Sequence, residues 1–254
     1  MTRPIGAAAP SSSLPTRNAF HLTRKCFHCL SGLLYALLAR NLPHSTWRAL
    51  SLSLVALVFL TEFSRLRHPA GPLNALVLSS FRPFMRHHET HQLSGMLYYT
   101  LGVALCTLLY SRTTACLAIL CLSVLDPIAA LIGVAFEPHL PELRLRNGKS
   151  LAAFIVAAFA AILVVFTALC FNEWTTLPTV DALSLAVVMG VLASFTELLV
   201  PSPQIILGWK SFPFGIDDNL FIPLVAGAVC EYLLTLREHQ VELSPLLLYK
   251  LHSS

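Results

Sequence analysis

The sequence has 254 residues, of which 56% are hydrophobic and only 12% are charged, and its formal net charge at pH 7 is +4. The mean hydropathy of +0.69 and the low charge content exclude an ordinary soluble protein, in which about a quarter of the residues are charged. The composition predicts an all-α integral membrane protein with one membrane domain. No basic segment interleaved with aromatic residues is present, so nucleic-acid binding is not expected.

In chain order, residues 1–23 are rich in small residues, proline and serine, and predict a disordered N-terminal tail. About twenty residues are needed for each membrane crossing, and on this basis hydropathy predicts about seven transmembrane helices. The predicted spans are residues 27–39, 47–63, 93–110, 114–136, 151–171, 180–200 and 220–236. They form one polytopic domain, residues 24–236, which is followed by a short C-terminal tail, residues 237–254. Between the second and third spans, residues 73–81 are expected to form a short helix on the membrane interface.

The orientation of these spans follows from the positions of the basic residues. Twelve of the 17 Lys and Arg residues fall on one side of the predicted topology. Short loops that are rich in these residues stay in the cytosol. The N-terminus and the loops after the second, fourth and sixth spans are therefore expected to be cytosolic.

The fourth span carries Asp126, followed directly by Pro127, inside an otherwise apolar stretch. An acidic side chain at membrane depth costs a few kcal/mol, so it usually faces a polar cavity and marks a functional site. The alternative is an aspartate that a neighbouring helix satisfies and that takes part in no chemistry. Pro127 removes one backbone hydrogen bond and predicts a kinked or broken helix. The other polar residues that approach the same membrane face are Arg24, Lys25, His28, Glu62, Arg65, Arg86, Glu89, Lys149, Glu197, Asp217, Asp218 and Asn219.

Carboxylates beside Lys and Arg at one membrane face suit a magnesium-bound phosphate site, whereas an ion pathway would place charges through the whole membrane depth. Gly148, Lys149 and Ser150 open a helix whose free N–H groups can hold phosphate. Simpler readings remain open for single members of the set: Arg24 and Lys25 can be a positive flank that fixes orientation, and the Asp217–Asn219 segment can be a helix cap.

The motifs occur in a fixed order along the chain. They are RKCFH (24–28), Glu62 with Arg65, MRHHETHQLSGMLYYTLG (85–102), DPIAALIG (126–133), GKSLA (148–152), Glu197 and DDNLFIP (217–223). This order resembles the CTP-dependent lipid alcohol kinases, which include CTP-dependent diacylglycerol kinase, dolichol kinase and phytol kinase and are related to the phosphatidate cytidylyltransferases. The segment around Arg86 and Glu89 looks most like the diacylglycerol kinase branch. One departure is that Leu151 and Ala152 follow Ser150, where the family usually has a Gly-Ser pair.

The resemblance implies a CTP-dependent kinase that phosphorylates a membrane lipid alcohol, with diacylglycerol converted to phosphatidic acid. Its partners would be CTP, the lipid substrate and the bilayer, and its cofactor Mg²⁺ or another divalent cation. The resemblance further implies a multi-pass protein of the endoplasmic reticulum membrane with a cytosolic active site. The implied catalytic residues are Asp126, Asp218 and Glu197, with Asp126 and Asp218 also as metal ligands. The implied phosphate-binding residues are Arg24, Lys25, Arg86, Gly148, Lys149 and Ser150. The implied supporting residues are His28, Glu62, Arg65, Glu89, Gly133, Asp217 and Asn219.

Two kinds of alternative remain open at this point. The first is another enzyme of the same broad group, either a dolichol or polyprenol kinase or a cytidylyltransferase that attacks the α-phosphate of CTP. The second is a small membrane transporter without catalytic activity, which would use the charges for ion coupling. Nothing in the sequence indicates an oligomeric state.

Overall fold

A computed structural model of the chain describes residues 22–136, 144–145, 147, 149–171, 177–200 and 215–252, without the side chains of residues 87, 88 and 239–252. Within these ranges the regular secondary structure is helical, and an isolated bridge joins Arg144 and Ser150. The elements are α1 (Leu22–Asn41), α2 (His44–Arg67), α3 (Pro72–Phe81), η1 (Arg82–Phe84), η2 (His87–Thr90), α4 (Gly95–Leu109), α5 (Arg112–Phe136), α6 (Leu151–Phe171), α7 (Thr179–Leu199) and α8 (Asp218–His252). The predicted all-α class is confirmed, while residues 1–21 of the predicted tail lie outside the described residues.

Every predicted span coincides with a helix, but not every helix is long and apolar enough to cross a membrane. Among the described residues, five helical stretches meet both conditions, namely α2, α5, α6, α7 and residues 218–238 of α8. The apolar helix α4 has only 15 residues, and α1 begins with polar residues in its first two turns. Seven helices are therefore found where seven spans were predicted, and five of them qualify as crossings.

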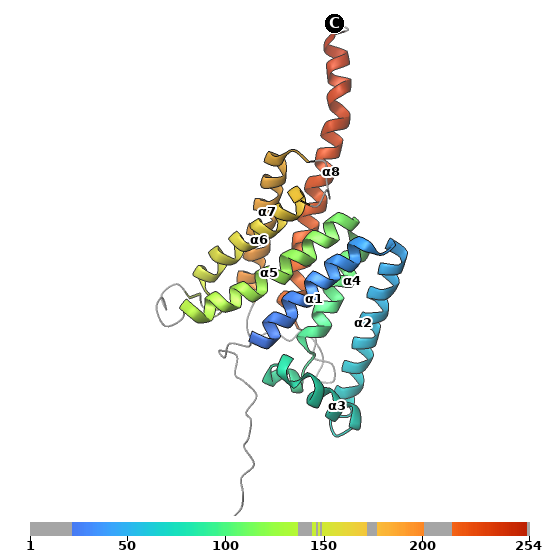
Figure 1. Cartoon of the computed structure of the whole chain (residues 1–254), viewed down its shortest axis with the longest axis vertical. Helices are drawn as coiled ribbons and strands as arrows, with labels where there is room; N and C mark the ends of the chain where they lie inside the picture. Colours follow the sequence, from blue (N-terminus) through green and yellow to red (C-terminus); the bar gives the residue numbers. More distant parts are fainter. Residues whose placement is uncertain are drawn as a thin grey trace, which may run out of the picture.

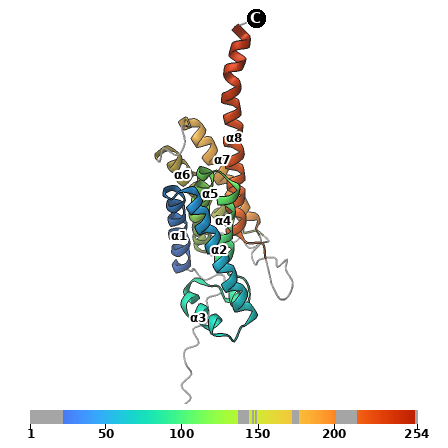
Figure 2. The same cartoon turned by 90° about the vertical axis from the view of Figure 1, so that its right-hand side faces the viewer.

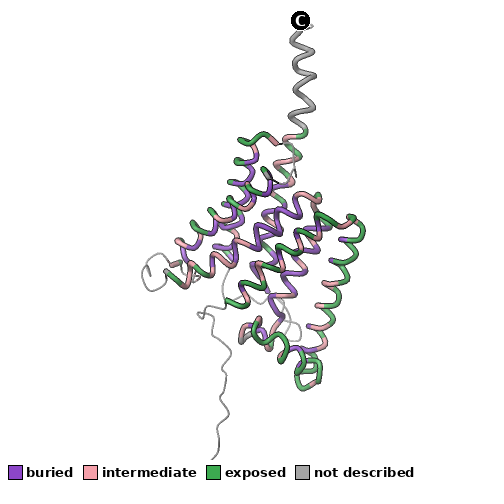
Figure 3. Tube along the Cα trace, viewed as in Figure 1, coloured by how far each residue is buried: buried purple, intermediate pink, exposed green. Residues whose placement is uncertain are grey.

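Helix α5 lies in the middle of the bundle (Figures 1 and 2). It packs against α1, α6 and α8, while α2 lies on the outside and packs mainly against α4. The side chains of Leu117, Ile119 and Leu122 on α5 are completely buried. The helix runs without a break through Pro127, so of the two predicted outcomes, a kink or a break, the break is not found. Figure 3 shows buried residues on the central helices and exposed residues along α2.

Apolar side chains also cover the outside of the bundle. Examples are Leu57 and Leu60 on α2, Phe159 and Leu163 on α6, and Val180 on α7, each of which is more than half exposed. A soluble protein rarely exposes so much contiguous apolar surface, whereas lipid tails solvate it well. The outer surface therefore agrees with a protein that sits in a bilayer.

Two glycines allow the close packing on which the charged end of the bundle depends. A Cβ atom at Gly32 would lie 1.6 Å from the Ser123 hydroxyl oxygen, so α1 can approach α5 only because this residue is glycine. A Cβ atom at Gly102 would lie 2.7 Å from the carbonyl oxygen of Asn219, so α4 likewise allows the start of α8 to come close. These contacts bring the first turns of α1 and α8 toward the same region.

Candidate functional site

Charged residues from seven segments meet at one end of the bundle, the lower end in Figure 1. They come from the starts of α1 and α8, the ends of α2 and α7, the segment before α4, the second half of α5 and the residues before α6. A buried charge is tolerated only when it is paired or hydrogen-bonded, so the partners of each group matter. The buried charged residues in this region are Lys25, Glu62, Arg65, Glu89, Asp126, Glu197, Asp217 and Asp218.

Asp126 is 6% exposed and is held by residues of α1. The Lys25 ammonium donates hydrogen bonds to both carboxylate oxygens, at 2.9 and 2.7 Å. The Nε2 atom of His28 lies 3.8 Å from Oδ2 of the same carboxylate. The polar surroundings of Asp126 are thus supplied by α1, which contributes an ammonium and an imidazole to the carboxylate; the functional role of Asp126 stays a prediction.

Lys149 connects two further carboxylates. Its ammonium donates a hydrogen bond to Oε1 of Glu197 and lies 3.6 Å from Oδ2 of Asp218. Burial lowers the pKa of Lys149, but Asp218 and Glu197 together outweigh burial and raise this pKa above its usual value. Asn147, which we did not predict, accepts a hydrogen bond from the Lys149 backbone N–H at 3.1 Å and donates one to the Leu198 carbonyl at 2.7 Å. This asparagine ties the lysine segment to the end of α7.

The residues at the start of α8 were predicted both as a helix cap and as part of the charged site. Oδ1 of Asp217 accepts hydrogen bonds from the backbone N–H and the side-chain amide of Asn219, at 2.9 and 2.7 Å. The capping interpretation is therefore correct, since the Asp217 carboxylate satisfies a free N–H in the first turn. Burial and the neighbouring Asp218 raise the pKa of Asp217. The helix N-terminus also favours negative groups nearby, including phosphate.

The segment before α4 contributes one carboxylate and one cation. Glu89 accepts hydrogen bonds from the backbone N–H groups of Arg86 and Gly95, at 2.8 and 3.2 Å, and lies 3.4 Å from the Arg24 guanidinium. Burial opposes the charge of Arg86, but the carboxylates of Asp218 and Glu89 outweigh it and raise the pKa of Arg86. The charged form of Arg86 is thus favoured by carboxylates of this segment and of the start of α8.

Arg65 and Glu62 form a buried ion pair behind this segment. The Arg65 guanidinium donates to both oxygens of Glu62, at 2.8 and 2.6 Å, and to the backbone carbonyls of residues 89, 90 and 92. Glu62 also accepts the backbone N–H of Ser94 at 2.8 Å. The pair therefore positions the backbone that carries Glu89, and its supporting role in the activity stays a prediction.

The remaining predicted residues lie less centrally. The Ser150 hydroxyl accepts the backbone N–H of Ala153 at 3.4 Å at the start of α6, and Gly148 lies outside the described residues. The carbonyl of Gly133 accepts a hydrogen bond from the Arg144 guanidinium at 3.3 Å. Among the described residues, no three His, Cys, Asp or Glu side chains are arranged to hold a metal ion by themselves.

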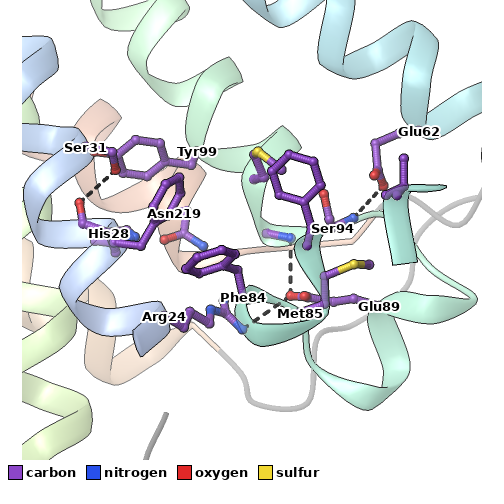
Figure 4. Close-up of a pocket in the computed structure, with 15 residues that line it drawn as sticks. Arg24, His28, Ser31, Glu62, Phe84, Met85, Glu89, Ser94, Tyr99 and Asn219 are labelled. Carbon is purple, nitrogen blue, oxygen red and sulfur yellow. Dashed lines mark hydrogen bonds and ion pairs between the residues drawn. The ribbon is translucent and has the colours of Figure 1, made fainter. Parts of the chain in front are cut away.

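A pocket lies beside the charged cluster, between α1, the α3–η1 segment and α4. Figure 4 shows Arg24, Glu89, Ser94 and Asn219 at its polar end. The apolar residues that line the rest are Phe27, Val77, Phe81, Phe84, Met85 and Met96. The apolar lining of this pocket was not predicted from the sequence, because residues 73–85 resemble an ordinary interfacial segment. Only the packing of η1 against α1 brings these side chains to a common cavity.

Fold and site together define a polytopic helical membrane protein with cations and carboxylates buried at one end. No family model and no solved structure matches the chain. The chain is 23% identical over 222 residues to CTP-dependent diacylglycerol kinase 1 of Schizosaccharomyces pombe, covering 82% of this chain and 91% of the relative. It is 27% identical over 217 residues to CTP-dependent diacylglycerol kinase 1 of Eremothecium gossypii, covering 80% of this chain and 64% of the relative. An uncharacterized protein of Rickettsia prowazekii is 29% identical over 155 residues, which cover 58% of this chain and 72% of that protein. The predicted resemblance to the CTP-dependent lipid kinases is therefore confirmed.

Proposed function

We propose that this protein is a CTP-dependent lipid kinase that transfers the γ-phosphate of CTP to the hydroxyl of diacylglycerol and forms phosphatidic acid. One observation carries the proposal: cations from distant parts of the chain converge on buried carboxylates at one end of a membrane bundle. These cations are Arg24, Lys25, Arg86 and Lys149. The names of the two fungal relatives supply the nucleotide and the acceptor.

The charges of the site suit phosphoryl transfer. In this reaction the protein mainly aligns the reacting groups and neutralises charge on the transferred phosphoryl oxygens. Lys25, Arg86 and Lys149 would hold the triphosphate, and the free N–H groups at the start of α8 would add to this positive field. Glu197, which is hydrogen-bonded to Lys149, is our candidate for the group that accepts the proton of the lipid hydroxyl.

We infer that Asp126 and Asp218 would hold a magnesium ion. The negative charge of Asp126 acts on the Asp218 carboxylate, and carboxylate oxygen is the ligand that Mg²⁺ prefers. The Lys25 ammonium, which donates to both oxygens of Asp126, would share that carboxylate with the ion. Magnesium is usually bound by one or two carboxylates together with substrate phosphates, so a site without a third protein ligand is sufficient. When bound, the ion would neutralise charge on the phosphate oxygens.

The distribution of Lys and Arg supports a cytosolic location for this end of the bundle. CTP is a soluble nucleotide, whereas the acceptor is a lipid, so a site at the membrane face can meet both. We place the protein in the endoplasmic reticulum membrane on the basis of the family resemblance.

The direct test is a transfer assay on the purified full-length protein in lipid micelles with Mg²⁺. CTP labelled at either the γ- or the α-phosphate is offered with diacylglycerol or dolichol, and labelled ATP serves as the donor control. Label from γ-CTP on diacylglycerol supports the proposal, and label on dolichol alone would make the protein a dolichol kinase. Label from α-CTP alone would indicate a cytidylyltransferase. If a folded protein labels no lipid, the transporter interpretation takes precedence.

Asp126→Asn should reduce transfer by about 100-fold or more, because the proposed magnesium ligand beside the phosphates loses its negative charge. The matched control is Asp181→Asn, which changes a half-exposed aspartate that pairs with Arg237 on α8. Because Asp126→Asn leaves Lys25 buried without a carboxylate, the double variant with Lys25→Met is included. The double variant should recover stability without recovering transfer, and near-normal transfer in either variant would contradict the role of Asp126.

A further inference from the structure

We infer that the pocket between α1, the α3–η1 segment and α4 is the binding site of the acceptor lipid. The hydrocarbon chain would lie against the apolar walls, and the hydroxyl would meet the polar end. The inference rests on the proposed function for the identity of the phosphate donor, but it concerns a separate part of the molecule. The pocket is lined by residues of the three elements and by Asn219 from α8.

The walls of the pocket suit a hydrocarbon chain. The rings of Phe27 and Phe84 lie 4.8 Å apart between centroids, and Val77 from α3 and Met96 from α4 complete the lining. Apolar walls gain free energy from a hydrocarbon chain and offer nothing to a triphosphate. On α3, Leu76 is 61% exposed and points away from the core, so this helix can lie on the membrane interface with the pocket beside it.

Several buried polar atoms that line the pocket have no hydrogen-bond partner in the described part of the chain, namely Nη1 of Arg24, Nε2 of His28, Oγ of Ser94 and Oδ1 of Asn219, and the last two are neutral groups that suit a lipid alcohol. Asn219 and Ser94 are each 3% exposed, and neither Oδ1 of Asn219 nor Oγ of Ser94 has a hydrogen-bond partner in the described part of the chain. Ser94 precedes α4 in the cap position but makes no side-chain cap hydrogen bond, and the N–H of Gly95 is donated to Glu89. Buried polar atoms are almost always hydrogen-bonded, so these two atoms indicate a ligand.

The two atoms match the polar groups of a diacylglycerol. Before transfer, the lipid hydroxyl can donate to Oδ1 of Asn219, and the Ser94 hydroxyl can donate to an ester carbonyl of the lipid; Glu197 remains the candidate that takes the hydroxyl proton during transfer. A polyprenol carries a hydroxyl but no ester, so it can satisfy only one of the two atoms. Asn219 directly follows Asp218, which places a hydroxyl bound there next to the charged cluster. The pocket therefore favours an ester-containing lipid alcohol.

Photolabelling tests the site without requiring catalysis. The probe is a diacylglycerol with a diazirine in one acyl chain, applied to the full-length protein in micelles without nucleotide and mapped by mass spectrometry. Labelling is expected in residues 77–85 and at Met96, and Phe84→Ala should reduce it about tenfold. The matched control is Phe159→Ala, which truncates a phenylalanine that is 72% exposed on α6 and should change nothing. Labelling confined to other helices, or equal labelling in Phe84→Ala, would overturn the inference. Protection by CTP but not by unlabelled diacylglycerol would also overturn it, because the pocket would then hold the nucleotide.

Competition against the same probe tests the polar end. Diacylglycerol should compete about fivefold better than the matching dialkylglycerol, in which ether groups replace the ester groups, and Ser94→Ala should abolish this difference. An unchanged preference in Ser94→Ala would contradict the assigned contact.

γ-Phosphate transfer is measured in parallel on the same preparations. Labelling of the pocket without transfer would refute the proposed function alone, whereas transfer with labelling elsewhere would refute the pocket assignment alone.

Discussion

Replacing Arg65 by lysine should loosen the segment that precedes α4. The Arg65 guanidinium donates to both Glu62 oxygens and to three backbone carbonyls, and the residue is 1% exposed. A lysine ammonium has three donors at one point and cannot reach this set together. Each buried carbonyl left without a donor costs about 1–3 kcal/mol. We expect Arg65→Lys to lower the free energy of unfolding by about 2–3 kcal/mol, and Arg65→Met by about 3–5 kcal/mol because Glu62 also loses its partner.

The assay is thermal unfolding in detergent, combined with limited proteolysis of residues 85–94. The matched control is Arg67→Lys, two residues along the same helix, where the exposed guanidinium lies 5.9 Å from the centroid of the Phe63 ring. This control should stay within about 0.5 kcal/mol of the unchanged protein. If Arg65→Lys is as stable as Arg67→Lys and its segment is equally protected from protease, the reasoning about Arg65 is refuted.

Three further predictions concern packing, charge and metal. Gly32→Ala should destabilise the protein by about 1–3 kcal/mol, because its Cβ atom would overlap the Ser123 hydroxyl, whereas Gly133→Ala, whose nearest neighbour would be 4.0 Å away, should cost little in the same thermal assay. Lys149→Met should reduce kcat/KM for CTP by about 100-fold, because a cation beside Glu197 is lost, and steady-state kinetics with varied CTP measure this. Chelation of divalent cations should abolish γ-phosphate transfer and added Mg²⁺ should restore it; transfer that persists in excess chelator would contradict the magnesium assignment.

The helices could be predicted because their apolar runs are long, and the one-sided charges could be predicted because Lys and Arg report orientation. The partners of these charges could not. Lys25 and Asp126 are separated by 101 residues, and their contact exists only because α1 packs closely against α5. No local sequence pattern predicts how α1 packs against α5. The sequence therefore indicated a polar environment for Asp126, but it did not indicate which residues provide it.

The structural roles of Glu62 and Arg65 could not be predicted from the sequence either. Three residues apart on one helix, they resemble an ordinary helical ion pair. Their importance comes from the carbonyls of the segment before α4, which fold back onto α2. In the same way, the hydroxyl of Ser94 could be expected to cap α4, and only the structure shows that it makes no cap hydrogen bond.

The distribution of charge along the described helices distinguishes catalysis at one face from ion transport through the membrane. At the end opposite the site, Arg112 donates to the carbonyls that end α1, and Glu231 accepts hydrogen bonds from Ser111. These contacts tie helix ends together. Within the described part of α4 and α6 no Asp, Glu, Lys, Arg or His occurs, and on α7 the two acidic residues, Asp181 and Glu197, stand near opposite ends. An ion or proton path requires polar groups at intervals through the membrane depth. The bundle instead gathers its cations and carboxylates where a lipid hydroxyl and a soluble nucleotide can meet, which is the arrangement that phosphoryl transfer at a membrane face requires.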